Sequence, residues 1–125
     1  MLHHISFAVT DLARSTAFYD VVLAMLGYRR VWTSDTAAGY GIEDENDLFA
    51  IKQRAQVQLP PSGFHLAFVA PSRAAVDAFH AAALEQGAKD LGAPGLRPHY
   101  GDNYYAAFVY DPDGYWIEAV INRAA

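Results

Sequence analysis

The chain has 125 residues, of which 53% are hydrophobic and 14% aromatic, so we expect one folded domain with a hydrophobic core. Its formal net charge of -5 and nine scattered basic residues argue against nucleic-acid binding, and the absence of cysteine excludes disulfides, thiolate metal sites and cysteine nucleophiles. No apolar run reaches the roughly 20 residues that span a bilayer and no signal peptide is recognisable, so we expect a cytoplasmic protein that does not bind membranes.

The first half of the chain predicts a strand, a helix and three further strands. Residues 2–9 alternate between the two faces of a half-buried strand, with His4 opposite the apolar face. Asp11 can cap a helix whose apolar stripe ends at Gly27. Extended segments are expected next at residues 28–33, 39–43 and 48–53. A linker with two prolines follows at about residues 54–62.

The second half of the chain repeats this order. A shift of 61 positions superposes four identical pairs, which are His4 on His65, Phe7 on Phe68, Ala17 on Ala78 and Phe18 on Phe79. Ser72 can cap the second helix, and Gly87 can end it. We therefore expect a single domain built from two modules, at about residues 1–53 and 63–122.

The last part of the chain predicts an irregular loop followed by a β-hairpin. Residues 89–103 are rich in proline and glycine, and such loops often carry function. The sequence Asp-Pro-Asp-Gly at residues 111–114 is a tight turn that pairs residues 105–110 with residues 115–121 in antiparallel fashion.

The register of this hairpin isolates one carboxylate. Glu118 shares a face with Trp116 and Val120 in an otherwise apolar strand. Carboxylates are seldom buried without a partner, so Glu118 either faces water or meets a cation. Arg97 and Arg123 are candidate partners, and a metal ion is another.

Equivalent positions of the two modules suggest a shared metal site. The hairpin turn aligns with residues 44–47 at a shift of 67, which makes Ile51 the counterpart of Glu118. If the cavity faces of the modules pack together, the equivalent inward positions are His4, Ile51, His65 and Glu118. Two imidazoles and one carboxylate suit a divalent ion (Fe, Mn, Zn or Ni) and leave positions for a substrate with two neighbouring oxygens. Taken singly, each histidine is as well explained by simple hydrogen bonding or solvation.

Further candidates lie just before the hairpin. His99 is a candidate proton-transfer group or extra ligand, because imidazole titrates near neutrality, and an exposed histidine without function is the alternative. With Glu118 it forms the candidate catalytic pair. Arg97, Tyr100 and Tyr104 are candidate substrate-binding residues, although the two tyrosines are equally explained by packing beneath the loop.

Three stretches resemble one protein superfamily. They are residues 4–11 with the later Leu-Gly-Tyr at 26–28, residues 63–68, and the segment from Asp-Pro-Asp-Gly to Glu118. They resemble the vicinal oxygen chelate superfamily, which groups glyoxalase I, fosfomycin-resistance proteins, bleomycin-resistance proteins and extradiol dioxygenases. The resemblance implies an α+β fold of two βαβββ modules, whose curved mixed sheets enclose a metal and substrate cavity. It also implies a homodimer that can complete the site, with His4, His65 and Glu118 as ligands.

No subfamily matches this chain in every feature. Glyoxalase I would carry a carboxylate at Ile51, and fosfomycin-resistance proteins continue past the final Glu to a phosphonate-binding Arg. Extradiol dioxygenases are generally longer, and bleomycin-binding members lack the ligands. We therefore expect a metal-dependent enzyme with lyase, isomerase or dioxygenase chemistry on a small molecule. A small-molecule binding or sequestering protein without catalysis, or a domain that serves dimerisation alone, is the alternative.

Overall fold

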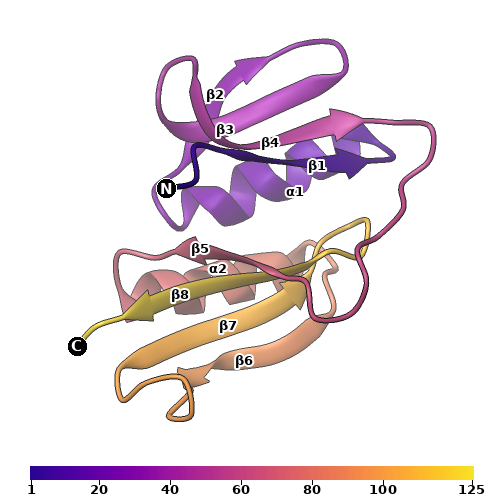
Figure 1. Cartoon of the computed structure of the whole chain (residues 1–125). Helices are drawn as coiled ribbons and strands as arrows, with labels where there is room; N and C mark the ends of the chain where they lie inside the picture. The colour runs from indigo at the N-terminus through magenta and orange to yellow at the C-terminus, as the bar shows by residue number, and fades with distance from the viewer.

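The computed structural model describes residues 1–125 as two four-stranded sheets, each with one helix (Figure 1). The first half of the chain contains β1 (Ile5–Val9), α1 (Leu12–Ala24), β2 (Arg29–Thr33), β3 (Ala37–Glu43) and β4 (Asn46–Gln53). The second half contains β5 (Leu66–Val69), α2 (Arg73–Glu85), β6 (Asp90–Leu96), β7 (Tyr104–Tyr110) and β8 (Trp116–Asn122).

The two sheets have the same topology. Their strand orders are β1-β4-β3-β2 and β5-β8-β7-β6, so in each sheet the first strand of the module lies beside its last. This first pairing is parallel in both sheets, and the remaining pairings are antiparallel. The predicted α+β fold of two βαβββ modules with mixed sheets is therefore confirmed.

The helix boundaries follow from local sequence signals. The side chain of Asp11 caps α1 and that of Ser72 caps α2, each by accepting a hydrogen bond from a backbone N–H of the first turn. Gly27 and Gly87 follow the helix ends with φ of 90° and 86°, a conformation that glycine adopts without steric cost. Neither helix is long and apolar enough to cross a membrane.

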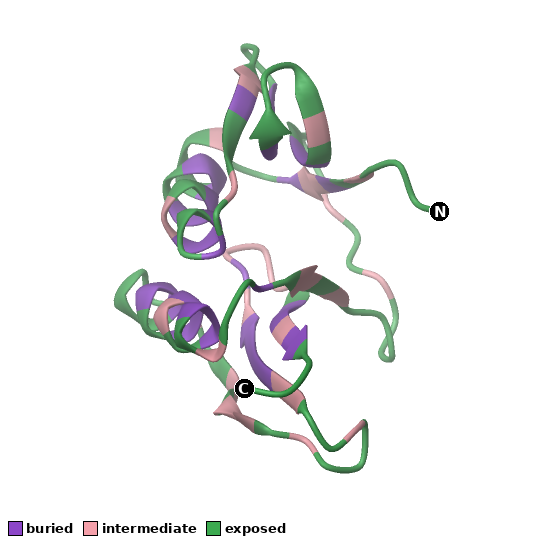
Figure 2. Cartoon of the chain, turned by 90° about the vertical axis from the view of Figure 1, so that its left-hand side faces the viewer, coloured by how far each residue is buried: buried purple, intermediate pink, exposed green.

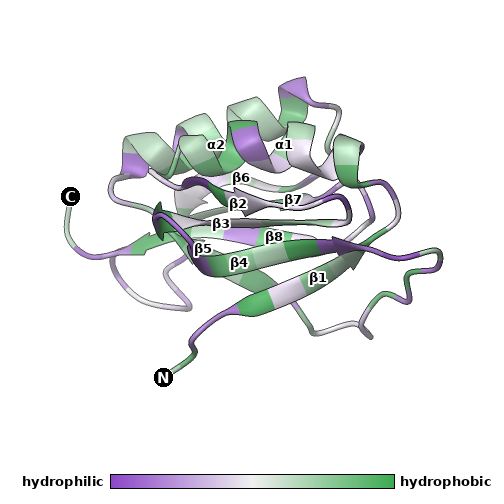
Figure 3. Cartoon of the chain, turned by 90° about the horizontal axis from the view of Figure 1, so that it is seen from above, coloured by the Kyte–Doolittle hydropathy of each residue, from purple (hydrophilic) through white to green (hydrophobic).

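Both helices lie on the same side of the two sheets, as Figures 2 and 3 show, and they contact each other. One hydrophobic core runs beneath them through both modules. At the junction Phe7 stacks on Tyr115 with ring centroids 4.1 Å apart, and Phe49 meets Phe68 edge-on at 5.2 Å. The opposite side of each sheet, which no helix covers, is called its open face below.

The segment after α2 differs from the prediction. An irregular loop was expected over residues 89–103, but its first part forms β6, which pairs with β7 through two register shifts. β6 is the outermost strand of its sheet, and an edge strand tolerates Pro94 because one of its sides has no partner. The irregular loop is therefore confined to residues 97–103.

Candidate functional site

The last strand places a buried carboxylate on the open face of the second sheet. Glu118 pairs with Ala67 of β5 and with Phe108 of β7, and directly paired residues point to the same face. Its neighbours Ile117 and Ala119 point the other way, into the core beneath α2. Glu118 is nevertheless only 1% exposed, so its carboxylate requires polar partners.

Those partners are His65 and Tyr104. Nε2 of His65 lies 3.0 Å from one carboxylate oxygen, and the Tyr104 hydroxyl donates to the other at 2.5 Å. Burial, followed by the hydrogen bond to Glu118, raises the pKa of Tyr104 well above its ordinary value, so the phenol stays protonated at neutral pH. Both carboxylate oxygens of Glu118 are therefore occupied, as its burial demands.

Aromatic rings surround the exposed side of His65. Its side chain is 43% exposed, and its ring centroid lies 6.2 Å from that of Phe108 and 5.9 Å from that of Trp116. Phe108 and Trp116 also contact each other, edge to face. This part of the open face is thus a partly apolar wall, to which a flat molecule can bind beside the imidazole.

The loop residues 97–103 bring further predicted residues to this wall. His99 packs on Tyr100 with ring centroids 4.1 Å apart, and Tyr100 packs on Tyr104 at 5.2 Å. Because Tyr104 contacts Glu118, a continuous row of rings connects the exposed His99 to the buried carboxylate.

Neither arginine proposed as a partner of Glu118 contacts it. Arg97 donates to the backbone carbonyls of Gly95 and Ala93, and its guanidinium lies over the ring of Phe108. Arg123 donates to the carbonyl of Pro71. The carboxylate is held by an imidazole and a phenol instead, and the two suggested arginine pairings are not formed.

His4 lies apart from this cluster. Its Nδ1 is 2.8 Å from Nδ1 of His3, and it lines a hollow of about 400 Å³ together with residues 66–69. Within the chain no group of three His, Cys, Asp or Glu side chains is close enough to hold a metal ion. One chain thus brings His65 and Glu118 together and leaves His4 on the other module.

The expected counterpart of Glu118 in the first module is displaced by one residue. Ile51 is fully buried in the core, not on the open face. The strand register instead makes Ala50 the counterpart, because it pairs with Ser6 as Glu118 pairs with Ala67. A shift of one residue moves a side chain to the opposite face of a strand. Ile51 therefore faces the core, and the prediction that it faces the cavity beside Glu118 is wrong.

The Asp-Pro-Asp-Gly turn holds the two modules together. One carboxylate oxygen of Asp111 accepts hydrogen bonds from the backbone N–H groups of residues 113–115, and the other accepts from the Tyr19 hydroxyl at 2.6 Å. Burial raises the pKa of Asp111, and these hydrogen bonds oppose the shift. An Asp at the start of a turn predicts hydrogen bonds to the backbone of the turn. Nothing in the sequence predicts the hydrogen bond from Tyr19 of α1.

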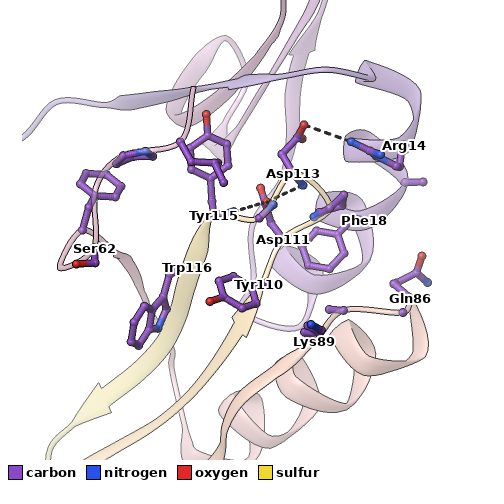
Figure 4. Close-up of a pocket in the computed structure, with 18 of the residues that line it drawn as sticks. Arg14, Phe18, Ser62, Gln86, Lys89, Tyr110, Asp111, Asp113, Tyr115 and Trp116 are labelled. Atoms are coloured by element: carbon purple, nitrogen blue, oxygen red, sulfur yellow. Dashed lines mark hydrogen bonds and ion pairs between the residues drawn. The ribbon is translucent and has the colours of Figure 1, made fainter. Parts of the chain in front are cut away.

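The second acid of the turn reaches the first module directly (Figure 4). Asp113 accepts from Thr10, Ser15 and Arg14, with the Arg14 guanidinium 3.2 Å away. A cavity of about 900 Å³ opens beside this network, between α1, the linker and the second module. Because both acids of the turn are engaged in structural hydrogen bonds, the cavity offers no free carboxylate. We therefore place the candidate site on the open face of the second sheet.

The duplicated βαβββ topology and the His-Glu pair on the open face invite comparison with known proteins. The profile of the Glyoxalase/Bleomycin resistance protein/Dioxygenase superfamily matches residues 1–119. The chain belongs to this superfamily. The resemblance seen in the sequence to the vicinal oxygen chelate proteins is thereby confirmed.

Several relatives of this glyoxalase-like chain share its whole length. An uncharacterized protein of Bacillus subtilis (strain 168), YqjT, is 33% identical over 95% of this chain and 97% of its own length. The crystal structure of a glyoxalase/bleomycin resistance protein from Albidiferax ferrireducens is 32% identical, with a TM-score of 0.81 over 94% of this chain and 95% of that one. The fosfomycin resistance protein FosX from Mesorhizobium loti is 24% identical, with a TM-score of 0.71 over 98% and 92% of the two chains, and shows the fold alone.

Proposed function

We propose that this member of the superfamily is a metal-dependent enzyme that binds a small molecule through two neighbouring oxygens. Its chemistry is that of a lyase, an isomerase or a dioxygenase. The observation that carries this proposal is the buried Glu118, which meets His65 on a face that no helix covers. A buried carboxylate costs stability unless it is paired, and one that is held beside an imidazole on an open face is a candidate functional group.

Two of the three ligands that a divalent ion would need lie side by side in one chain. His65 and Glu118 supply one imidazole nitrogen and one carboxylate oxygen 3.0 Å apart, a donor set that Fe, Mn, Zn and Ni accept. Tyr104 donates to the other oxygen of Glu118 and so fixes the orientation of the carboxylate. A bound divalent ion supplies Lewis-acid stabilisation of negative charge that develops on a substrate oxygen.

The third ligand in this proposal is His4, provided by a second copy of the chain. Within one chain His4 does not reach His65 and Glu118, and no other His, Asp or Glu completes a set of three. A homodimer in which the open face of one first sheet meets the open face of the other second sheet brings an imidazole to this pair. The dimer then contains two equivalent sites, as two-fold symmetry requires.

The other loop residues act on the substrate in this proposal. His99, exposed at the end of the row of rings, transfers a proton between the substrate and solvent. Tyr100 and Tyr104 line the substrate position, and Arg97 holds a polar group of the substrate above the ring of Phe108.

A binding protein without catalysis is the second candidate. The wall of His65, Phe108 and Trp116 favours it, because stacked and edge-on rings suit capture of a flat ligand without any metal. Untagged protein purified without chelators separates the two candidates by elemental analysis. About one divalent ion per chain supports the enzyme, whereas tight binding of a flat aromatic ligand by metal-free protein supports the binding function.

Mixing of variants tests the proposed metal site. His4→Ala and His65→Ala proteins should each lose the metal. After subunit exchange, a mixed dimer contains one intact site, composed of His4 from one chain with His65 and Glu118 from the other. Mixing should therefore restore up to half a metal ion per chain in each mixed dimer. His3→Ala, which alters the exposed neighbour of His4, is the matched control and should retain its metal. Full metal occupancy of His65→Ala alone would contradict the proposal.

A further inference from the structure

The guanidinium of Arg97 lies in a recess formed by two glycines. A Cβ on Gly92 would lie 3.1 Å from one terminal guanidinium nitrogen, and a Cβ on Gly95 would lie 3.2 Å from the other. The same nitrogens donate to the carbonyls of Ala93 at 2.7 Å and Gly95 at 2.9 Å. Glycine at both positions leaves room for the group, and the two carbonyls fix its plane. The guanidinium is therefore held in one orientation before any ligand binds.

This cation has no carboxylate partner within the chain. Arg14, Arg29 and Arg30 each form an ion pair with an aspartate. Arg97, like Arg54, Arg73 and Arg123, forms none, and its guanidinium donates to two carbonyl oxygens and lies over the face of Phe108. Two carbonyls use two of the N–H groups of the guanidinium and leave the remaining donors available. A fixed, partly buried guanidinium with spare donors is a receptor for a carboxylate or another planar oxyanion.

The position of Arg97 relative to Glu118 gives the size of the ligand. Gly92, Phe108 and Glu118 pair in one row across β6, β7 and β8, so they share the open face. Neighbouring strands are about 4.8 Å apart, which places the two ends of this row roughly 10 Å from each other. A row of about this length suits a small ligand, such as a single six-membered ring with polar groups at its two ends.

We propose, on the basis of the function proposed above, that the substrate is a planar aromatic acid whose carboxylate binds Arg97. Its ring lies between the guanidinium and His65, beside Phe108, and its two neighbouring oxygens lie at the opposite end, beside His65 and Glu118. The ring is thus enclosed by aromatic side chains, and the charge of the acid is matched by the isolated cation. A neutral ligand of the same shape leaves the guanidinium without a counter-ion and binds more weakly.

Two probes that differ by one carboxylate test this inference. Calorimetry compares 3,4-dihydroxybenzoate with catechol on nickel-treated protein, and the ratio of the two affinities is the readout. We expect the acid to bind at least about tenfold more tightly to the wild type. Arg97→Ala should abolish this preference, so that the acid no longer binds more tightly than catechol. Arg97→Lys should restore it only in part, because an ammonium lacks the planar fork.

Gly92→Ala and Arg123→Ala are the matched variants. Gly92→Ala keeps the charge, but its Cβ would lie 3.1 Å both from the guanidinium and from the Phe108 ring, so it should shift the two groups slightly and reduce the preference. Arg123→Ala removes an exposed arginine of the same module and should change nothing. Unfolding midpoints of all variants establish that they are folded. If Arg97→Ala does not fold, the Arg97→Lys protein still tests the inference.

The outcomes separate this inference from the proposed function. Equal affinity of the wild type for the two probes, including no binding of either, overturns the inference, and so does an unchanged preference in a folded Arg97→Ala protein. Loss of the preference in Arg97→Ala supports it, even where His65→Ala leaves metal content and the affinity for catechol unaltered. That last result would refute the metal site and keep the carboxylate receptor.

Discussion

The two modules have the same topology but present different chemistry on their open faces. One row of paired residues crosses the first sheet as Ser6, Ala50, Gly39 and Trp32, and the equivalent row crosses the second as Ala67, Glu118, Phe108 and Gly92. The first row has a floor of small residues, over which the Trp32 indole folds. The second has a carboxylate and a phenyl ring, with the Arg97 guanidinium above its glycine. Topology therefore fixes where side chains point but leaves the chemistry of each face free to diverge.

The hairpin turns of the two modules show the same divergence. In the first module Glu45 turns the chain with φ of 67°, and Asp44 forms an exposed ion pair with Arg29. In the second module Asp111 is buried and tied to Tyr19 on the other module. Only the second turn therefore connects the modules.

The largest effect on stability is expected from substitution of Asp111, the residue that distinguishes the second turn from the first. Asp111→Ala deletes the acceptor of three backbone N–H groups and of the Tyr19 hydroxyl, and leaves these buried and partly buried donors without their partner. We expect a loss of about 3–5 kcal/mol in the free energy of unfolding, measured by urea titration. Asp44→Ala, at the exposed turn, should change it by no more than about 0.5 kcal/mol. Similar losses in the two variants would show that the turns are equivalent.

The sequence predicts the periodic and local features of this fold well. Alternation, helix stripes, the capping residues Asp11 and Ser72 and the final hairpin are all found, because each depends on neighbouring residues. The prediction for Ile51 is wrong because the strand register relates β4 to β8 by a shift of 68, one more than the shift of 67 that aligns the acidic residues of the two turns. The sequence does not predict strand β6, because its proline and two glycines resemble those of a loop.

The candidate site was only partly predictable. The pairing of His65 with Glu118 follows from the repeat and the hairpin register, and the structure brings these residues together. The Tyr104 contact and the glycine recess of Arg97 depend on side-chain packing across β6 and β7, for which no local pattern exists. The separation of His4 from His65 and Glu118 depends on how the two modules pack together. The sequence pattern within each module does not determine that packing.

The packing of Trp32 on the open face of the first sheet can be tested at Gly39. A Cβ on Gly39 would lie 2.2 Å from Nε1 of Trp32 and 2.8 Å from Cβ of Asp47, so Gly39→Ala must displace the indole. We expect a loss of about 1–3 kcal/mol in unfolding free energy and a change in tryptophan emission as the hydrogen bond to Asp47 breaks. In a Trp32→Ala background the same substitution should cost less, and a double-mutant cycle measures the difference. Equal costs in both backgrounds would show that Trp32 does not cover Gly39.

The smallest effect concerns the contact between each helix and the outermost strand of its sheet. In the first module Arg30 of β2 binds Asp20 of α1. In the second module the contact is between Asp90 of β6 and His80 of α2, 3.0 Å apart. The hydrogen bond from His80, with a smaller contribution from the backbone N–H of Gly92, lowers the pKa of Asp90.

This lowered pKa makes the second contact sensitive to acid. A carboxylate with a lower pKa in the folded than in the unfolded state contributes stability that is present above its unfolded pKa, about 3.9, and is lost as the pH falls through its folded pKa. Between pH 5 and pH 2 the wild type should therefore lose slightly more stability than Asp90→Asn, and the two should converge at the acid end. Urea midpoints measured across this range give the comparison. Parallel curves would mean that the carboxylate of Asp90 gains nothing from His80 in the folded state, so that this edge of the second module is held by its backbone pairing to β7 alone.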